Sequence, residues 1–76
     1  MDTEGRSLSA LVKEIRRQLS LSQEDLARLL GVSYATVNRW ENGLSKPSKL
    51  AKAQLESFCK KMTGQGKLTL PEGEHR

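Results

Sequence analysis

Apolar residues recur along this chain at helical spacing, in four blocks separated by short polar segments. The first block puts Leu8, Leu11, Val12, Ile15 and Leu19 on one face of a helix. Ser7 stands just before the block and suits the N-cap position. The pattern predicts a helix that opens at Ser7, after a flexible N-terminal segment over residues 1–6.

The second block predicts a short helix with clear start and stop signals. Ser22 followed by Asp25 fits a capping box. Gly31 can adopt the left-handed conformation that ends a helix. Between these signals the apolar residues fall at i, i+3 and i+4: Leu26, Leu29 and Leu30.

The third block follows after a tight turn and predicts a second short helix over residues 33–42. Ser33 suits its N-cap, Val37 and Trp40 lie on one face, and Asn42 is followed by Gly43. We expect Trp40 to be a core residue, against the alternative that it stacks on a ligand. The opposite face is polar or small and looks outward: Ala35, Asn38, Arg39 and Asn42, with Tyr34 at its edge.

The fourth block predicts a helix that covers the core, after a loop over residues 44–48 that contains Pro47. Its apolar residues are Ala51, Leu55, Phe58 and Met62, with Leu50 and Cys59 beside them. Residues 63–76 have three glycines and a proline, which favours a flexible C-terminal tail. The alternative is an edge strand over residues 67–70 that pairs with another copy or with a partner.

These residues carry a resemblance to a known family. The stretch from Ser22 to Gly43, SQEDLARLLGVSYATVNRWENG, resembles the Cro/C1-type helix-turn-helix of phage-repressor-like (XRE family) DNA-binding domains. The matching residues are Gln23, Leu26, Ala27, Gly31, Val32, Ser33, Val37, Trp40, Glu41, Asn42 and Gly43. The resemblance extends from about Ile15 to about Phe58. It implies an all-α fold, a small four- to five-helix bundle of the lambda-repressor-like type, over residues 7–62.

The resemblance also implies roles for residues around the predicted turn. Residues 33–42 correspond to the recognition helix, which enters the major groove of duplex DNA. Gln23 matches a position that commonly contacts phosphate and braces base contacts; the alternative is an ordinary polar residue in the first turn of its helix. Tyr34, Ala35 and Arg39 match base-reading positions; Arg39 suits guanine but can hold a phosphate instead. Ala35 departs from the polar residues common there.

The remaining candidate residues have open alternatives. Tyr34 can stack on the sugar backbone, donate its hydroxyl group or simply be exposed, and Asn38 either reads a base or stays solvated. The resemblance implies an ion pair between Arg16 and Glu41, whose alternative is two separate solvated charges. Candidate phosphate contacts, which position a protein without reading sequence, are Ser33, Thr36, Asn42 and Ser45. Lys46 and Lys49 would flank the duplex on the same side, and the alternative for either lysine is a solvated surface charge.

Charge is consistent with a polyanionic partner. Thirteen Lys and Arg against nine Asp and Glu give a net charge of +4, and the sequence pI is about 9.6. Residues 12–62 hold ten basic and five acidic residues, net +5, so the excess lies in the predicted fold. Only 36% of the residues are hydrophobic, and no stretch approaches a membrane span. A cytoplasmic protein is therefore expected.

The sequence does not predict an enzyme. The sole histidine, His75, lies in the predicted tail, Cys59 is the only cysteine, and no phosphate-binding glycine loop or metal-ligand spacing occurs. No cofactor or metal is expected. Sequence-specific binding of double-stranded DNA in transcription regulation is the leading hypothesis, with a two-fold homodimer as the family's usual arrangement. The alternative is a protein-interaction module, antitoxin-like or coactivator-like, whose tail binds another protein.

Overall fold

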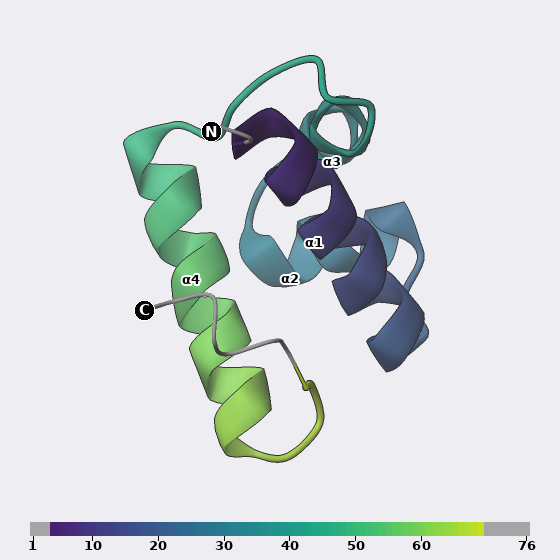
Figure 1. Cartoon of the computed structure of the whole chain (residues 1–76), viewed down its shortest axis with the longest axis vertical. Coiled ribbons are helices and arrows are strands. Elements are labelled where there is room, and N and C mark those ends of the chain that lie inside the picture. The colour runs from purple at the N-terminus through teal and green to yellow at the C-terminus, as the bar shows by residue number, and fades with distance from the viewer. Residues whose placement is uncertain (1–3, 70–76) are drawn as a thin grey trace.

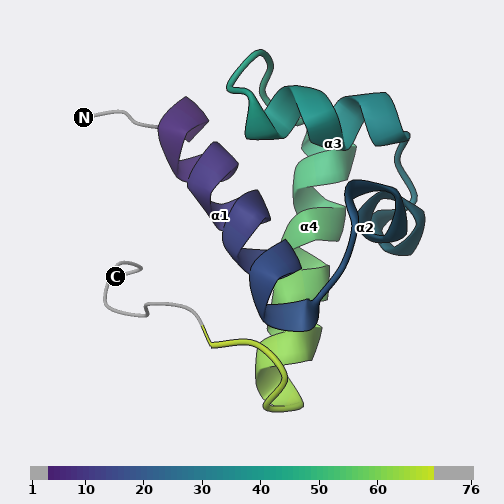
Figure 2. The same cartoon turned by 90° about the vertical axis from the view of Figure 1, so that its right-hand side faces the viewer.

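The protein is an all-α bundle of four helices over the part of the chain that the structure, a computed structural model, describes (residues 4–69). The helices are α1 (Glu4–Leu19), α2 (Gln23–Leu30), α3 (Tyr34–Glu41) and α4 (Lys49–Gly64). No strand occurs within residues 4–69. Helix α3 packs against both α1 and α2, and α4 crosses and contacts α2 (Figures 1 and 2). The predicted fold class is confirmed.

The core forms where the apolar stripes of the helices meet. Trp40 and Val37 of α3 are essentially inaccessible to solvent, so Trp40 is a core residue as predicted. Partly buried side chains, including those of Phe58, Cys59 and Met62 on α4, close the core from outside. The buried apolar residues are Leu8, Val12, Ile15, Leu26, Ala27, Leu30, Val37, Trp40, Leu55 and Leu68.

Serine caps fix where three of the helices begin. The hydroxyl groups of Ser22, Ser33 and Ser48 each accept a hydrogen bond from the backbone N–H three residues ahead, at 2.9–3.1 Å. Gly31 ends α2 with φ +77°, a left-handed conformation that glycine adopts without steric cost. The turn between α2 and α3 is therefore specified at both of its ends by local chemistry.

Helix α1 begins earlier than the sequence pattern predicted. Its first residue is Glu4, so the expected cap at Ser7 is wrong, as is the flexible segment where it covers residues 4–6; residues 1–3 lie outside the described range. The apolar stripe begins only at Leu8 and marks the part of the helix that must be buried. Good helix formers such as Glu4 and Arg6 extend the helix beyond it.

The prediction of a flexible C-terminal tail from residue 63 is wrong as far as residue 69. Helix α4 continues to Gly64, the chain turns with Gly66 at φ +75°, and Leu68 enters the core with 3% of its surface exposed. Residues 67–69 form no strand within this single chain; the alternative of an edge strand over residues 67–70 needs a second chain to pair with and stays a prediction, and Leu70 lies beyond the described range. A single apolar residue after a turn has no periodicity, so its burial left no signal in the sequence.

Two leucines on predicted apolar faces are instead exposed. Leu29 of α2 and Leu50 of α4 have 58% and 69% of their surface accessible. Helices α2 and α4 each contribute only a narrow stripe of side chains to the core. Leu26 and Leu30 occupy the stripe on α2, and Leu55 occupies the stripe on α4. Helical spacing places a residue on a face of its own helix, but it does not say how far the neighbouring helix extends across that face.

Candidate nucleic-acid interface

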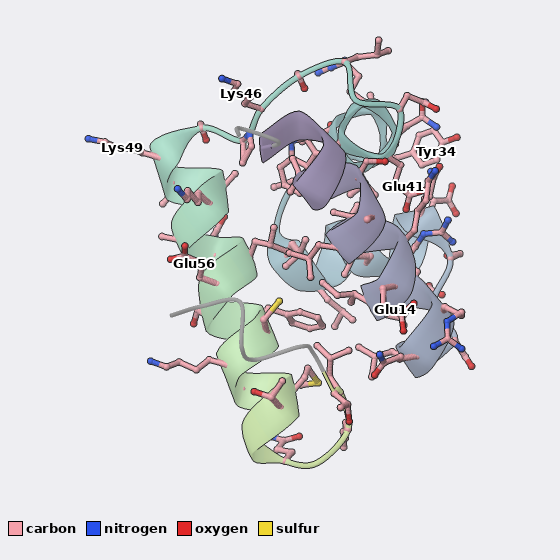
Figure 3. All side chains as sticks on the ribbon, in the orientation of Figure 1. Glu14, Tyr34, Glu41, Lys46, Lys49 and Glu56 are labelled. Atoms are coloured by element: carbon pink, nitrogen blue, oxygen red, sulfur yellow. The ribbon has the colours of Figure 1, made fainter. Side chains whose placement is uncertain are left out.

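Helix α3 has one buried and one exposed face. Val37 and Trp40 point into the core, while Tyr34, Ala35 and Arg39 are solvent-exposed. In Figure 3, Tyr34 lies at the surface of the bundle, and Lys46 and Lys49 project from the loop and the start of α4. Of the predicted contact residues, Ser33, Tyr34, Ala35, Arg39, Asn42 and Lys46 are exposed, and Gln23, Thr36, Asn38 and Ser45 are half-buried.

The expected ion pair between Arg16 and Glu41 is present and has a two-pronged geometry. Nε and Nη2 of Arg16 donate to Oε2 and Oε1 of Glu41, at 2.6 and 3.0 Å. The remaining Nη1 donates to the backbone carbonyl of Leu21 at 3.2 Å. Glu41 is 6% exposed, so its charge is compensated in a poorly hydrated position. The pair ties α1 to the end of α3.

Two further contacts tie Glu41 to its surroundings. The hydroxyl group of Ser9 donates to the backbone carbonyl of Glu41 at 2.6 Å, which adds a second link from α1 to α3. Hydrogen bonds from Arg16 hold the pKa of the Glu41 carboxyl below its usual value; burial opposes this effect, and a hydrogen bond from Gln23 adds to it. Glu41 is therefore a carboxylate that can only accept hydrogen bonds.

Side-chain amides continue from this carboxylate across the surface of α3. Nε2 of Gln23 donates to Oε1 of Glu41 at 3.0 Å, and Oε1 of Gln23 accepts from Nδ2 of Asn38 at 3.2 Å. Nδ2 of Asn42 donates to Oδ1 of Asn38 at 3.1 Å and to the Asn38 backbone carbonyl at 2.9 Å. We call Gln23, Asn38 and Asn42 the amide chain. It joins the first turn of α2 to the exposed side of α3.

A polar hollow of about 460 Å³ lies between α3, the following loop and the start of α4. Hydroxyl groups and two cationic side chains surround it, and Trp40 contributes to its wall. Five of the predicted contact residues meet here although they come from separate segments. The lining residues are Val32, Ser33, Thr36, Arg39, Trp40, Ser45, Lys46, Ser48 and Ala51.

Sequence reasoning missed three residues of this region. Ser48 lines the hollow and caps α4, and its signal was a serine directly before a long helical segment. Ser9 reaches Glu41, and Gln18 binds the C-terminal segment at Thr69; both contacts cross long distances in the chain and left no local signal.

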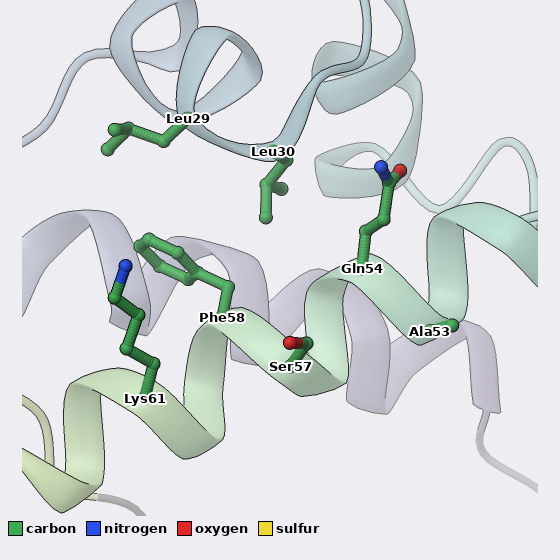
Figure 4. Close-up of a pocket in the computed structure, with 7 residues that line it drawn as sticks. All are labelled: Leu29, Leu30, Ala53, Gln54, Ser57, Phe58 and Lys61. Carbon is green, nitrogen blue, oxygen red and sulfur yellow. The ribbon is translucent and has the colours of Figure 1, made fainter.

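A second hollow of about 500 Å³ lies between α2 and α4 and includes no residue of α3. Leu29 and Phe58 lie across it from each other, with the Lys61 side chain at one end (Figure 4). Its lining residues are Leu29, Leu30, Ala53, Gln54, Ser57, Phe58 and Lys61.

Comparison with known sequences assigns the family. A helix-turn-helix family model matches residues 12–53, more than half of the chain, and the match spans α2, the turn and α3. The chain belongs to the Cro/C1-type (XRE) helix-turn-helix family. It is thus a DNA-binding helix-turn-helix domain, and the family is not a catalytic one. In this helix-turn-helix domain, α2 and α3 are the two helices that the turn joins.

One curated relative is a larger protein that contains a segment similar to this chain. The chain is 41% identical over 49 residues to a type II methyltransferase, M1.ScrFI, of Lactococcus lactis subsp. cremoris. The match covers 60% of this helix-turn-helix chain but only 13% of the methyltransferase. No solved structure matched the chain.

Three further observations concern the residues that the structure describes. No helix within residues 4–69 is long and apolar enough to cross a membrane. Within the same residues, no three His, Cys, Asp or Glu side chains lie together in a way that could hold a metal ion. Burial raises the pKa of the Cys59 thiol, with a smaller contribution from Glu56, so the thiolate is disfavoured there.

Proposed function

We propose that this helix-turn-helix domain binds double-stranded DNA sequence-specifically and regulates transcription, with α3 in the major groove. The observation that carries this proposal is the two-sided character of α3. Val37 and Trp40 anchor the helix, while Tyr34, Ala35 and Arg39 stand free on the other side. A major groove is wide enough for one such helix, and residues near its N-terminus reach the base edges.

We assign base reading to Arg39 first. Its guanidinium group is exposed and can donate two parallel hydrogen bonds to O6 and N7 of guanine. Tyr34 and Ala35 lie on the first turn of α3 and would meet neighbouring bases, Ala35 through its methyl group alone. The side chain at Ala35 is consistent with contact to a thymine methyl group.

Phosphate binding is assigned to the polar hollow beside α3. Ser33, Thr36, Ser45 and Lys46 would surround a backbone phosphate there, and Ser48 joins them. Backbone N–H groups at the start of α2, beginning with Gln23, would bind a second phosphate, because the N-terminus of a helix favours an anion. Such contacts hold the domain in register on the duplex.

The deciding experiment is selection of duplexes from a random DNA pool, followed by titration of the winners at several salt concentrations. Specific binding predicts one recovered sequence and an affinity that falls as salt rises. A palindrome with half-sites about 10 base pairs apart would support a two-fold dimer. Enrichment of no sequence, with only weak salt-sensitive binding, would contradict the proposal and favour the protein-interaction alternative, for which the hollow at Leu29 and Phe58 offers a surface.

Arg39→Ala tests the central base-reading assignment. We expect it to lower discrimination at one base position by about 1–3 kcal/mol. Arg28→Ala is the matched control, because Arg28 is an exposed arginine on α2 that pairs with Asp25 at 3.6 Å. An Arg39→Ala variant with unchanged base preference would remove Arg39 from the set of base-reading residues.

A further inference from the structure

Trp40 joins the hydrophobic core to the polar hollow beside α3. Its side chain belongs to the same core cluster as Val37, and only 1% of its surface is exposed. The same residue forms part of the wall of the hollow, together with Thr36 and Lys46. A nearly buried side chain thus reaches the surface that is proposed to meet DNA.

The indole ring of Trp40 carries one polar group, the Nε1–H, which can donate a hydrogen bond but cannot accept one. Within the described residues, every fully buried side-chain nitrogen or oxygen has a hydrogen-bond partner. Nε1 of Trp40 donates to no acceptor among those residues, so it is not a fully buried atom. Since Trp40 has so little exposed surface and lines the hollow, this N–H lies at the edge of the hollow.

The groups around this N–H suit an anion with several acceptor oxygens. The hydroxyl groups of Ser33 and Thr36 lie 2.9 Å apart, so one donates to the other and one hydroxyl hydrogen is left over. Arg39 and Lys46 bring two positive charges to the hollow. Of the described residues, none that lines the hollow is acidic. A phosphate group has both the negative charge and the acceptor oxygens that these donors require.

We infer that the indole N–H of Trp40 is a DNA-binding group, which donates a hydrogen bond to a backbone phosphate held in this hollow. This inference rests on the proposed function, which places a phosphate there but gives Trp40 no part in binding it. The ring stays in the core, so packing fixes the direction of the donor before DNA arrives. A donor that is already ordered loses little side-chain entropy on binding, unlike a lysine such as Lys46.

A neutral donor to phosphate has a signature that separates it from the other contacts. Phosphate contacts carry no sequence information, so the loss of the N–H should weaken binding to all duplexes alike. The salt dependence of affinity counts the phosphate charges that cationic side chains neutralise. The N–H of Trp40 carries no charge, so its loss should leave the salt slope unchanged. Lys46→Ala should instead reduce that slope by about 1.

NMR spectroscopy of the indole group tests the inference directly. Trp40 is the sole tryptophan of the chain, so its N–H gives one indole signal in a nitrogen–proton correlation spectrum. We expect this signal to exchange with water in the unbound chain, because Nε1 is accessible. On titration with a selected duplex, it should move downfield together with the backbone signals of α3.

Replacement of the indole nitrogen tests the energetic contribution. Benzothienylalanine keeps the shape of the tryptophan ring but has a sulfur atom in place of the N–H, and the single tryptophan gives one replacement site. We expect the affinity for the selected duplex to fall roughly three- to tenfold, with the same sequence preference and salt slope. A fluorinated tryptophan, which keeps the N–H, is the matched control and should bind as the wild type does. Melting temperatures of both proteins check that the core is intact.

Two results would overturn the inference while leaving the proposed function intact. One is an indole signal that stays in place while a selected duplex shifts the backbone signals of α3. The other is a folded benzothienylalanine protein that binds with wild-type affinity. A wild-type chain that selects no duplex would overturn the proposed function, and the inference with it.

Discussion

The side-chain amide of Gln18 pairs with both backbone polar groups of Thr69. Oε1 accepts from the Thr69 N–H at 2.8 Å, and Nε2 donates to the Thr69 carbonyl at 2.9 Å. A side chain of α1 thus binds the returning chain as a neighbouring strand would. The preceding residue, Leu68, lies in the core. The segment after α4 is therefore part of the domain over residues 67–69.

Leu68→Ala should destabilise the domain although it lies far from the helix-turn-helix. Removing a buried leucine side chain costs about 2–5 kcal/mol in unfolding free energy. In a domain of this size, each kcal/mol lowers the melting temperature by about 4–8 °C. Leu44→Ala, at a leucine that is 69% exposed, is the control and should leave the melting temperature nearly unchanged. Equal melting temperatures for both variants would show that Leu68 is not a core residue in solution.

Glu41→Ala should lower stability by removing the acceptor of three hydrogen bonds. Arg16 and Gln23 would lose their partner in a half-buried setting, and a hydrogen bond to a charged group contributes about 1.5–3 kcal/mol. Chemical unfolding measures the change, and a double-mutant cycle with Arg16→Ala isolates the pair. Glu56→Ala removes an exposed glutamate from α4 and should have little effect. A Glu41→Ala variant as stable as wild type would contradict the role of the pair.

Stability should fall in acid, and Glu41 should account for part of the fall. Arg16 lowers the pKa of Glu41 below its ordinary 4.5. Such a carboxyl stabilises the fold above its unfolded pKa and loses that contribution as pH falls through its folded pKa. We therefore expect the unfolding free energy to decline below about pH 4.5.

Urea unfolding between pH 7 and pH 3 measures this contribution. Glu41→Gln should flatten the decline without abolishing it, because the pKa of Asp25 is also lowered by its cap at Ser22 and that of Glu14 lies at about 2. Glu56→Gln removes the same charge from an exposed site on α4 and should keep the wild-type slope. Identical slopes for the two variants would argue against the assignment to Glu41.

Ser20→Gly should stabilise the domain. Ser20 follows α1 with φ +55°, a left-handed conformation that costs a residue with a Cβ atom about 1–2 kcal/mol. Glycine removes this strain but makes the unfolded chain more flexible, so we expect a net gain of about 0.5–1 kcal/mol in thermal unfolding. Ser57→Gly, in the interior of α4, should shift the melting temperature in the opposite direction. A loss of stability with Ser20→Gly would contradict the strain at this position.

The sequence alone determined the elements whose signals are local. Serine caps at Ser22 and Ser33, the left-handed Gly31, and the burial of Val37 and Trp40 all follow from propensity and helical spacing. These features are encoded within a few residues of one another. They were sufficient to predict the helix-turn-helix unit and its outward face.

The tertiary structure decided what depends on contacts between distant residues. Helical spacing cannot show that Leu29 of α2 is exposed while Leu68 is buried in the core. Burial depends on how far the neighbouring helix extends across a face, and the local sequence does not contain that information. The family resemblance suggested the ion pair of Arg16 with Glu41. Only the tertiary structure shows that Gln23 donates a hydrogen bond to Glu41 and accepts one from Asn38. The resulting network links side chains from three helices: Arg16 of α1, Gln23 of α2 and Glu41 of α3.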